Sequence, residues 1–171
     1  MTTHAIFLPK RPLVRAEQFE WRLGGKRKTA EFSYFYQDEF LGKLYWAISG
    51  GTGNFDDENY FAFSMTLPYR SDETLTGVYD LKKGLTCVHS HWIPAPPGFI
   101  GMATVDADSA TLNIIKYDPE TDIATGSFEA LFKSNRYRLM PKGTFTMIRV
   151  RPTEAGSLQL RASPPQRPLK E

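Results

Sequence analysis

The stretch at residues 60–67 constrains the fold of this chain more than any other segment. Large apolar side chains stand at every second position, and smaller or more polar side chains stand between most of them. The large apolar set is Phe61, Phe63, Met65 and Leu67. A period of two residues places alternate side chains on opposite faces of a β-strand. The segment therefore predicts a strand with one face in a hydrophobic core, and Pro68 marks its end.

Segments of the same character recur along the chain, each rich in β-branched or aromatic residues and bounded by turn-forming residues. They cover residues 40–48, 75–81, 99–106, 111–117, 123–132 and 144–150. Residues 118–122, Asp-Pro-Glu-Thr-Asp, predict a turn that joins two of these strands as a hairpin. The best helical window, residues 14–22, offers only a couple of turns and also fits a strand near residues 19–23.

About eight to ten strands without intervening helices predict an all-β fold. Two architectures fit this pattern, an antiparallel β-sandwich and a lipocalin-like β-barrel. Uneven strand lengths and several long connections favour the sandwich. The phenylalanines Phe61, Phe63, Phe128 and Phe145, together with Met65, are expected in the core because each lies on the apolar side of a strand with clean alternation.

The length of 171 residues is typical of one domain with one sizeable core. We expect a single β domain over residues 1–162. Residues 163–171 contain Pro164, Pro165 and Pro168 among polar and charged side chains, and they predict a flexible tail.

Charge and cysteine content restrict the classes of partner. A formal net charge of +2 gives no reason to expect nucleic acid as a ligand. Cys87 is the single cysteine, so no intramolecular disulfide can form, which favours a reducing compartment. No apolar stretch reaches the roughly 20 residues of a membrane span, and the first residues do not form a signal peptide. The sequence therefore predicts a cytoplasmic protein without a membrane partner, although secretion without a signal peptide would leave no mark in it.

Three phrases resemble a known group of β-sheet domains. They are Thr-Gly-Val-Tyr-Asp-Leu at residues 76–81, the hairpin segment at residues 110–130, and Lys-Gly-Thr-Phe-Thr at residues 142–146. Their order is similar to that in domains of unknown function found mainly in lipoproteins of Bacteroidetes, and the similarity covers residues 76–150. The resemblance implies a β-sheet fold, and since that group has no established activity it implies no chemistry.

Cys87, His89 and His91 form a candidate metal site. Residues two apart in a strand point to the same face, so the three side chains would project together. The outer two would lie about 13 Å apart, too far to share one ion. His89 and His91 are therefore the predicted metal ligands, with zinc as the cofactor if any is bound, and a third ligand must come from elsewhere.

Two loops are candidate binding sites. Residues 49–59 are rich in glycine and carry Phe55 beside the carboxylates of Asp56 and Asp57, which suit Ca²⁺ in type but not in spacing. Phe55 either plugs the end of the core or stands out as an anchor for a partner. Trp92 precedes the second loop, residues 93–98, which is rich in proline. We expect Phe55, Asp56, Asp57 and Trp92 to contact a ligand.

The sequence contains no paired catalytic carboxylates, no phosphate-binding glycine loop and no nucleophilic serine elbow. The first hypothesis is therefore a non-catalytic module that binds a protein or a small carbohydrate-like ligand through loops of a β scaffold. The alternative is a metal-dependent enzyme with its site near Cys87, His89 and His91.

Overall fold

The computed structural model describes residues 18–72, 75–133 and 138–151. Twelve strands account for most of these residues, more than the eight to ten predicted, and they confirm the all-β class. The strands are β1 Gln18–Leu23, β2 Lys26–Thr29, β3 Phe32–Phe40, β4 Lys43–Thr52, β5 Phe61–Pro68, β6 Gly77–Asp80, β7 Thr86–Trp92, β8 Met102–Asp106, β9 Ser109–Asp118, β10 Ile123–Lys133, β11 Arg138–Leu139 and β12 Lys142–Val150. A single 3-10 turn covers Leu81–Lys83. The predicted tail at residues 163–171 lies outside the described residues.

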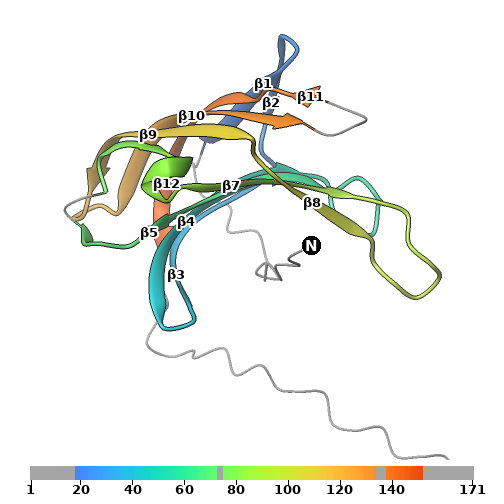
Figure 1. Ribbon diagram of the computed structural model, residues 1–171, viewed down its shortest axis with the longest axis horizontal. Coiled ribbons are helices and arrows are strands. Elements are labelled where there is room, and N and C mark those ends of the chain that lie inside the picture. The colour runs from blue at the N-terminus through green and yellow to red at the C-terminus, as the bar shows by residue number, and fades with distance from the viewer. Residues whose placement is uncertain (1–17, 73–74, 134–137, 152–171) are drawn as a thin grey trace, which may run out of the picture.

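The strands form one mixed sheet that folds into two layers (Figure 1). The strand order is β6-β9-β10-β12-β3-β4-β5-β7-β8, with β1 beside β12, β2 beside β1 and β11 beside β10. Strand β12 joins the layers, because its first part pairs with β10 and β1 while Arg149 and Val150 pair with β3. The β12–β3 pairing is parallel, and the other described pairings are antiparallel. The described sheet stays open between β6 and β8, so it does not close into the alternative barrel.

An aromatic core fills the space between the layers. Phe63 of β5 contacts Phe128 and Phe132 of β10, with ring centroids 5.9 and 5.8 Å apart. Four of the five predicted core residues are almost fully buried, namely Phe63, Met65, Phe128 and Phe145. The fifth, Phe61, is half-buried and stacks on Trp21 at the margin of the core. The hairpin predicted from residues 118–122 is also confirmed, as the turn between β9 and β10.

The predicted boundary between a strand at 40–48 and a loop at 49–59 is wrong. Leu41 and Gly42 form the turn between β3 and β4, with φ values of 51° and 71°, so Phe40 and Gly42 do not share a strand with Trp46. Strand β4 instead continues through Ser-Gly-Gly to Thr52. Residue 50 of this strand must be small, because the Phe19 ring lies 2.4 Å from the position that a Cβ atom would take. Glycine meets this requirement.

Candidate functional site

The two loops singled out in the sequence lie at the same end of one layer. The first loop precedes β5, and the second follows β7. Since β5 and β7 are antiparallel neighbours, the start of one lies beside the end of the other. The backbone N–H of Trp92 donates a hydrogen bond to the carbonyl of Tyr60 over 2.9 Å, which ties the two loops together.

An aromatic cluster occupies this end of the layer, on the face away from the main core, and its two tyrosines are buried. We use this name for four side chains, Phe32, Tyr34, Phe55 and Tyr60. Their rings follow one another in contact, with centroids 5.9 Å apart for Tyr34 and Phe32, 5.8 Å for Phe32 and Tyr60, and 4.4 Å for Tyr60 and Phe55. They are not part of the main core, because Phe32 and Tyr34 alternate with Phe35, and Tyr60 alternates with Phe61, which both face it.

Phe55 therefore takes neither of the two positions expected for it. It does not plug the core and it does not stand free: it is half-buried and stacks on Tyr60 with an interplanar angle of 17°. Burial, and to a smaller extent the nearby Tyr34, raise the pKa of Tyr60 to about 12, so its hydroxyl stays protonated at neutral pH. Part of the Phe55 ring is therefore exposed, while its contact with the buried Tyr60 ring holds it in place.

The loop that carries Phe55 satisfies its own polar groups. Asn54 accepts a hydrogen bond from the backbone of Asp57 over 2.7 Å and donates one to its carboxylate over 2.7 Å. The side chain of Asn59 accepts from the backbone of Asn54. Asp56 and Asp57 are exposed, and their role as ligand contacts stays a prediction. These bonds give the loop a defined shape that holds Phe55 in place.

The second loop forms an apolar hairpin, the name we give to residues 92–102. Residues 92–105 contain no charged side chain, and the hairpin exposes 76% of Phe99 and 70% of Ile100, with 37% of Ile93 exposed at its base. The hairpin extends from the body of the molecule beyond the two layers (Figure 1). The residue pattern predicts one strand over residues 99–106, whereas β8 begins at Met102. The absence of charge over residues 92–105 is the signal that could have marked Phe99 and Ile100 as exposed contact residues.

The predicted histidine pair lies on the core side of β7. His89 is 2% exposed, and its Nδ1–H donates to the Ala62 carbonyl over 3.2 Å. The His89 and His91 rings stack with centroids 4.9 Å apart. Burial lowers the pKa of His89 to about 4, so the imidazole is neutral at neutral pH. Burial also raises the pKa of the Cys87 thiol to about 12, which leaves it without the thiolate that a nucleophile needs.

The described residues do not complete a metal site at this pair. They contain no group of three or more His, Cys, Asp or Glu side chains that could hold an ion. His4, the remaining histidine of the chain, lies outside the described residues. Zinc at His89 and His91 therefore stays a prediction.

A buried cation that the sequence did not single out lies where the two layers join. Arg149 donates to the Asp72 carboxylate and to the Gln37 side chain, each over 2.9 Å. Its guanidinium lies 4.6 Å from the centre of the Trp46 ring, and Tyr117 contributes a longer hydrogen bond at 3.4 Å. Four different elements supply these partners, so the network connects distant parts of the chain. No sequence signal could have revealed it, because Asp72 and Arg149 are 77 positions apart.

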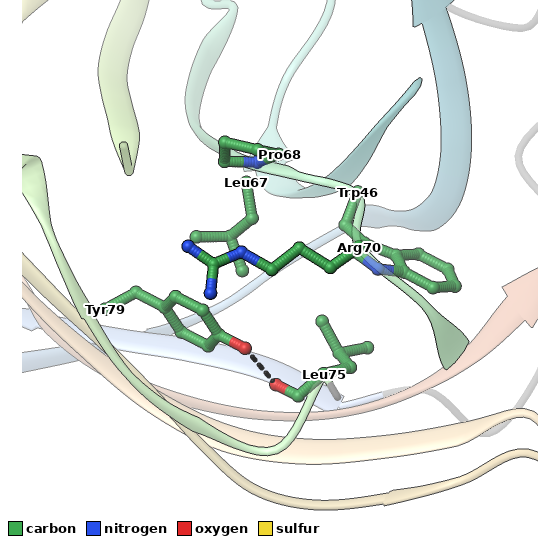
Figure 2. A pocket seen from close by; sticks show the side chains of 6 residues that line it. All are labelled: Trp46, Leu67, Pro68, Arg70, Leu75 and Tyr79. Carbon is green, nitrogen blue, oxygen red and sulfur yellow. Dashed lines mark hydrogen bonds between the residues drawn. The ribbon is translucent and has the colours of Figure 1, made fainter. Parts of the chain in front are cut away.

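The cavity beside this network is too small for a substrate. It has a volume of about 30 Å³, room for about one water molecule, and Figure 2 shows the Arg70 side chain extended across it between Leu67 and Tyr79. The Tyr79 hydroxyl donates to the Leu75 carbonyl at its far side (Figure 2). We therefore interpret Arg149 and its partners as a structural network.

A second hollow, of about 350 Å³, is open to solvent and borders the Phe55 loop. Its lining is polar and consists of Lys28, Thr29, Glu31, Thr52, Gly53 and Asn59. Small-molecule sites are usually concave and mostly apolar. This lining includes no aromatic face on which a sugar ring could stack, which weakens the case for a carbohydrate ligand here.

Comparison of the chain with protein-family models, with curated proteins and with solved structures finds no match. The resemblance to the lipoprotein domains therefore stays a prediction. None of the helices in the described part is long and apolar enough to cross a membrane.

Proposed function

We propose that this protein is a non-catalytic protein-interaction module that contacts its partner through the apolar hairpin and the half-buried Phe55 of the adjoining aromatic cluster. The observation that carries the proposal is the exposure of Phe99 and Ile100 in a stretch without charge. Burying such a side chain in a partner contributes about 1.5 to 3 kcal/mol. Large exposed apolar side chains that are contiguous mark interaction sites, whereas isolated ones are ordinary.

The geometry of this surface supports a protein partner over a small molecule. The hairpin is convex and carries apolar side chains at its tip, so it fits an apolar groove on another protein. Pro94, Pro96 and Pro97 restrict the backbone of the loop, which lowers the entropy lost on binding. A cytoplasmic location, where thiols stay reduced, suits a chain whose single cysteine is unpaired.

Site-specific photo-crosslinking in the native cell tests this function. Benzoylphenylalanine at position 99 should crosslink a defined partner several-fold more than the same group at position 115. Ile115 is the matched control, because it is also apolar and 61% exposed but lies on β9. Equal crosslinking at both positions would refute the proposed contact surface.

A further inference from the structure

Within the described part of the chain, strand β8 is an open edge of the sheet, and its backbone can pair with another strand. Among the described residues, β8 pairs with β7 alone. Ile93 N–H donates to the Gly101 carbonyl, and Ala107 N–H donates to the Cys87 carbonyl. Hydrogen-bonded and non-hydrogen-bonded pairs alternate along an antiparallel ladder. Gly101, Ala103, Val105 and Ala107 therefore direct their backbone groups at β7, whereas Met102, Thr104 and Asp106 direct theirs away from it.

This edge lacks the features that usually prevent pairing between edges. Natural edge strands carry lysines or prolines, or are interrupted by bulges. Strand β2, which also lies at a margin of the described sheet, carries Lys26, Arg27 and Lys28 in its four residues. Strand β8 reads Met-Ala-Thr-Val-Asp and has no proline, no lysine and a single charge at its end. Of these two edges, β8 is the one left open for pairing.

We propose that a second copy of this chain pairs with β8 in an antiparallel, two-fold symmetric arrangement centred on Thr104. This inference goes beyond the proposed function, because it concerns the backbone of β8 rather than the side chains at the hairpin tip. The symmetry axis places Thr104 opposite Thr104 and Met102 opposite Asp106. Each of these pairs exchanges two backbone hydrogen bonds. The outward backbone groups of Met102, Thr104 and Asp106 thus meet the same groups of an identical strand in reverse.

The side chains on this edge agree with self-pairing. Thr104 is exposed, and its hydroxyl lies 3.1 Å from the Ser90 hydroxyl on β7, so the threonine pair would extend a row of hydroxyl groups across the interface. Facing threonines are favourable cross-strand pairs. The Asp106 side chains of the two copies would lie about 13 Å apart, four residues along a strand, so like charges do not meet. A five-residue strand buries little area, which predicts a dimer whose population depends on concentration.

Charge complementation at Thr104 tests the symmetric pairing. Sedimentation equilibrium of the full chain should show the wild type shifting from monomer to dimer as concentration rises. Thr104→Lys and Thr104→Glu should each remain monomeric, because each places like charges face to face, while their equal mixture should recover the dimer. Both variants should fold, since Thr104 is exposed and its N–H is not needed by β7. A monomeric wild type, dimers in either single variant, or a mixture that stays monomeric would overturn the proposal.

A disulfide test gives a second measurement. Facing residues in a hydrogen-bonded pair have Cα atoms about 5.5 Å apart, within the range that a disulfide spans. Thr104→Cys should form a covalent dimer on mild oxidation, whereas Thr111→Cys, exposed on β9, should not. Cys87 does not interfere, because it is 2% exposed. Equal rates for the two variants would overturn the pairing, and crosslinks from position 99 to a different protein would leave the proposed function intact.

Discussion

Burial decides what the polar side chains of β7 can do. The two-residue period correctly predicts that Cys87, His89 and His91 point to one face, since they lie opposite Met65, Phe63 and Phe61 of β5. That face is the core, where a neutral imidazole and a protonated thiol are favoured. His89 donates from one ring nitrogen to the Ala62 carbonyl, and its ring contacts those of Phe61, Phe63 and Phe132. The burial of His89 should therefore affect the stability of the fold at low pH.

The free energy of unfolding should fall as the pH drops from about 6.5 to 4. In the unfolded chain the histidine binds a proton near pH 6.5, whereas the folded chain does so only at about 4, so protons favour the unfolded state in this window. Each unit of pKa difference corresponds to about 1.4 kcal/mol, so we expect a loss of about 2 to 3 kcal/mol. Urea titrations at several pH values measure it, and His89→Gln should flatten the slope. An unchanged slope in that variant would show that His89 is not the group responsible.

The carboxylates act in a different pH range, which separates the two effects. The hydrogen bond from Arg151 lowers the pKa of Asp122 from its ordinary value of 3.8, and Arg149 and Tyr117 contribute less. A depressed carboxyl pKa stabilises the fold above the unfolded value and loses that contribution as the pH falls below it. The loss of stability caused by protonation of Asp122 therefore begins at about the pH at which the loss caused by His89 is complete.

At the scale of the element, β4 shows how packing extends a strand through residues that locally favour a loop. Gly50 and Gly51 lie inside it, and Gly51 would place a Cβ atom 2.5 Å from both Phe32 and the Phe61 carbonyl. Neither glycine needs a positive φ. Their function is to leave room for aromatic side chains from other strands.

Gly50→Ala should destabilise the fold by about 1 to 3 kcal/mol, the usual cost of an added carbon in a filled core. The cause would be contact with Phe19, which is 1% exposed and cannot move outward easily. Chemical denaturation of Gly50→Ala, Phe19→Leu and the double variant tests the cause. The double variant should be less destabilised than the sum of the single changes, because the smaller ring makes room for the methyl group. Simple additivity would contradict the proposed contact.

At the scale of the whole molecule, the joint between the layers depends on few backbone contacts. The parallel pairing of β12 with β3 covers only Arg149 and Val150 opposite Phe35 and Tyr36. The side chain of Arg149 strengthens this joint, because its partners come from β3, β4, β9 and the segment after β5. A cation that is 91% buried and bonded from several directions fixes these segments relative to one another.

Arg149→Met should destabilise the protein by about 2 to 4 kcal/mol, since it leaves Asp72 without its cationic partner in a partly buried position. The carboxylate retains some hydration, which keeps the expected cost below that of a fully buried pair. Arg151→Met is the matched control, because Arg151 also bonds an aspartate but is 57% exposed, and it should change the melting temperature far less. Similar losses in both variants would show that Arg149 does not hold the layers together.

Local pattern determined several of the strands, the turn at residues 118–122 and most of the predicted core, because alternation and turn chemistry act between neighbouring residues. It also pointed to the loop that carries Phe55 and to the loop after Trp92, although it began the first loop at residue 49, whereas β4 continues to Thr52. Contacts between distant residues decided the rest. The sequence could not show that Gly50 faces Phe19, that Tyr60 supports Phe55, or that the two loops meet.

The role of Arg149 and the open edge at β8 likewise appear only when the layers are assembled. Arg149 looks like an ordinary cation near the end of the chain until β3, β4 and β9 surround it. In the sequence, Thr104 resembles any other strand residue. The assembled sheet shows that β7 pairs with one side of its strand, and that no described strand pairs with the other side. Tertiary structure decides such matters because burial and pairing depend on segments that the fold brings together across 27 to 112 positions of sequence.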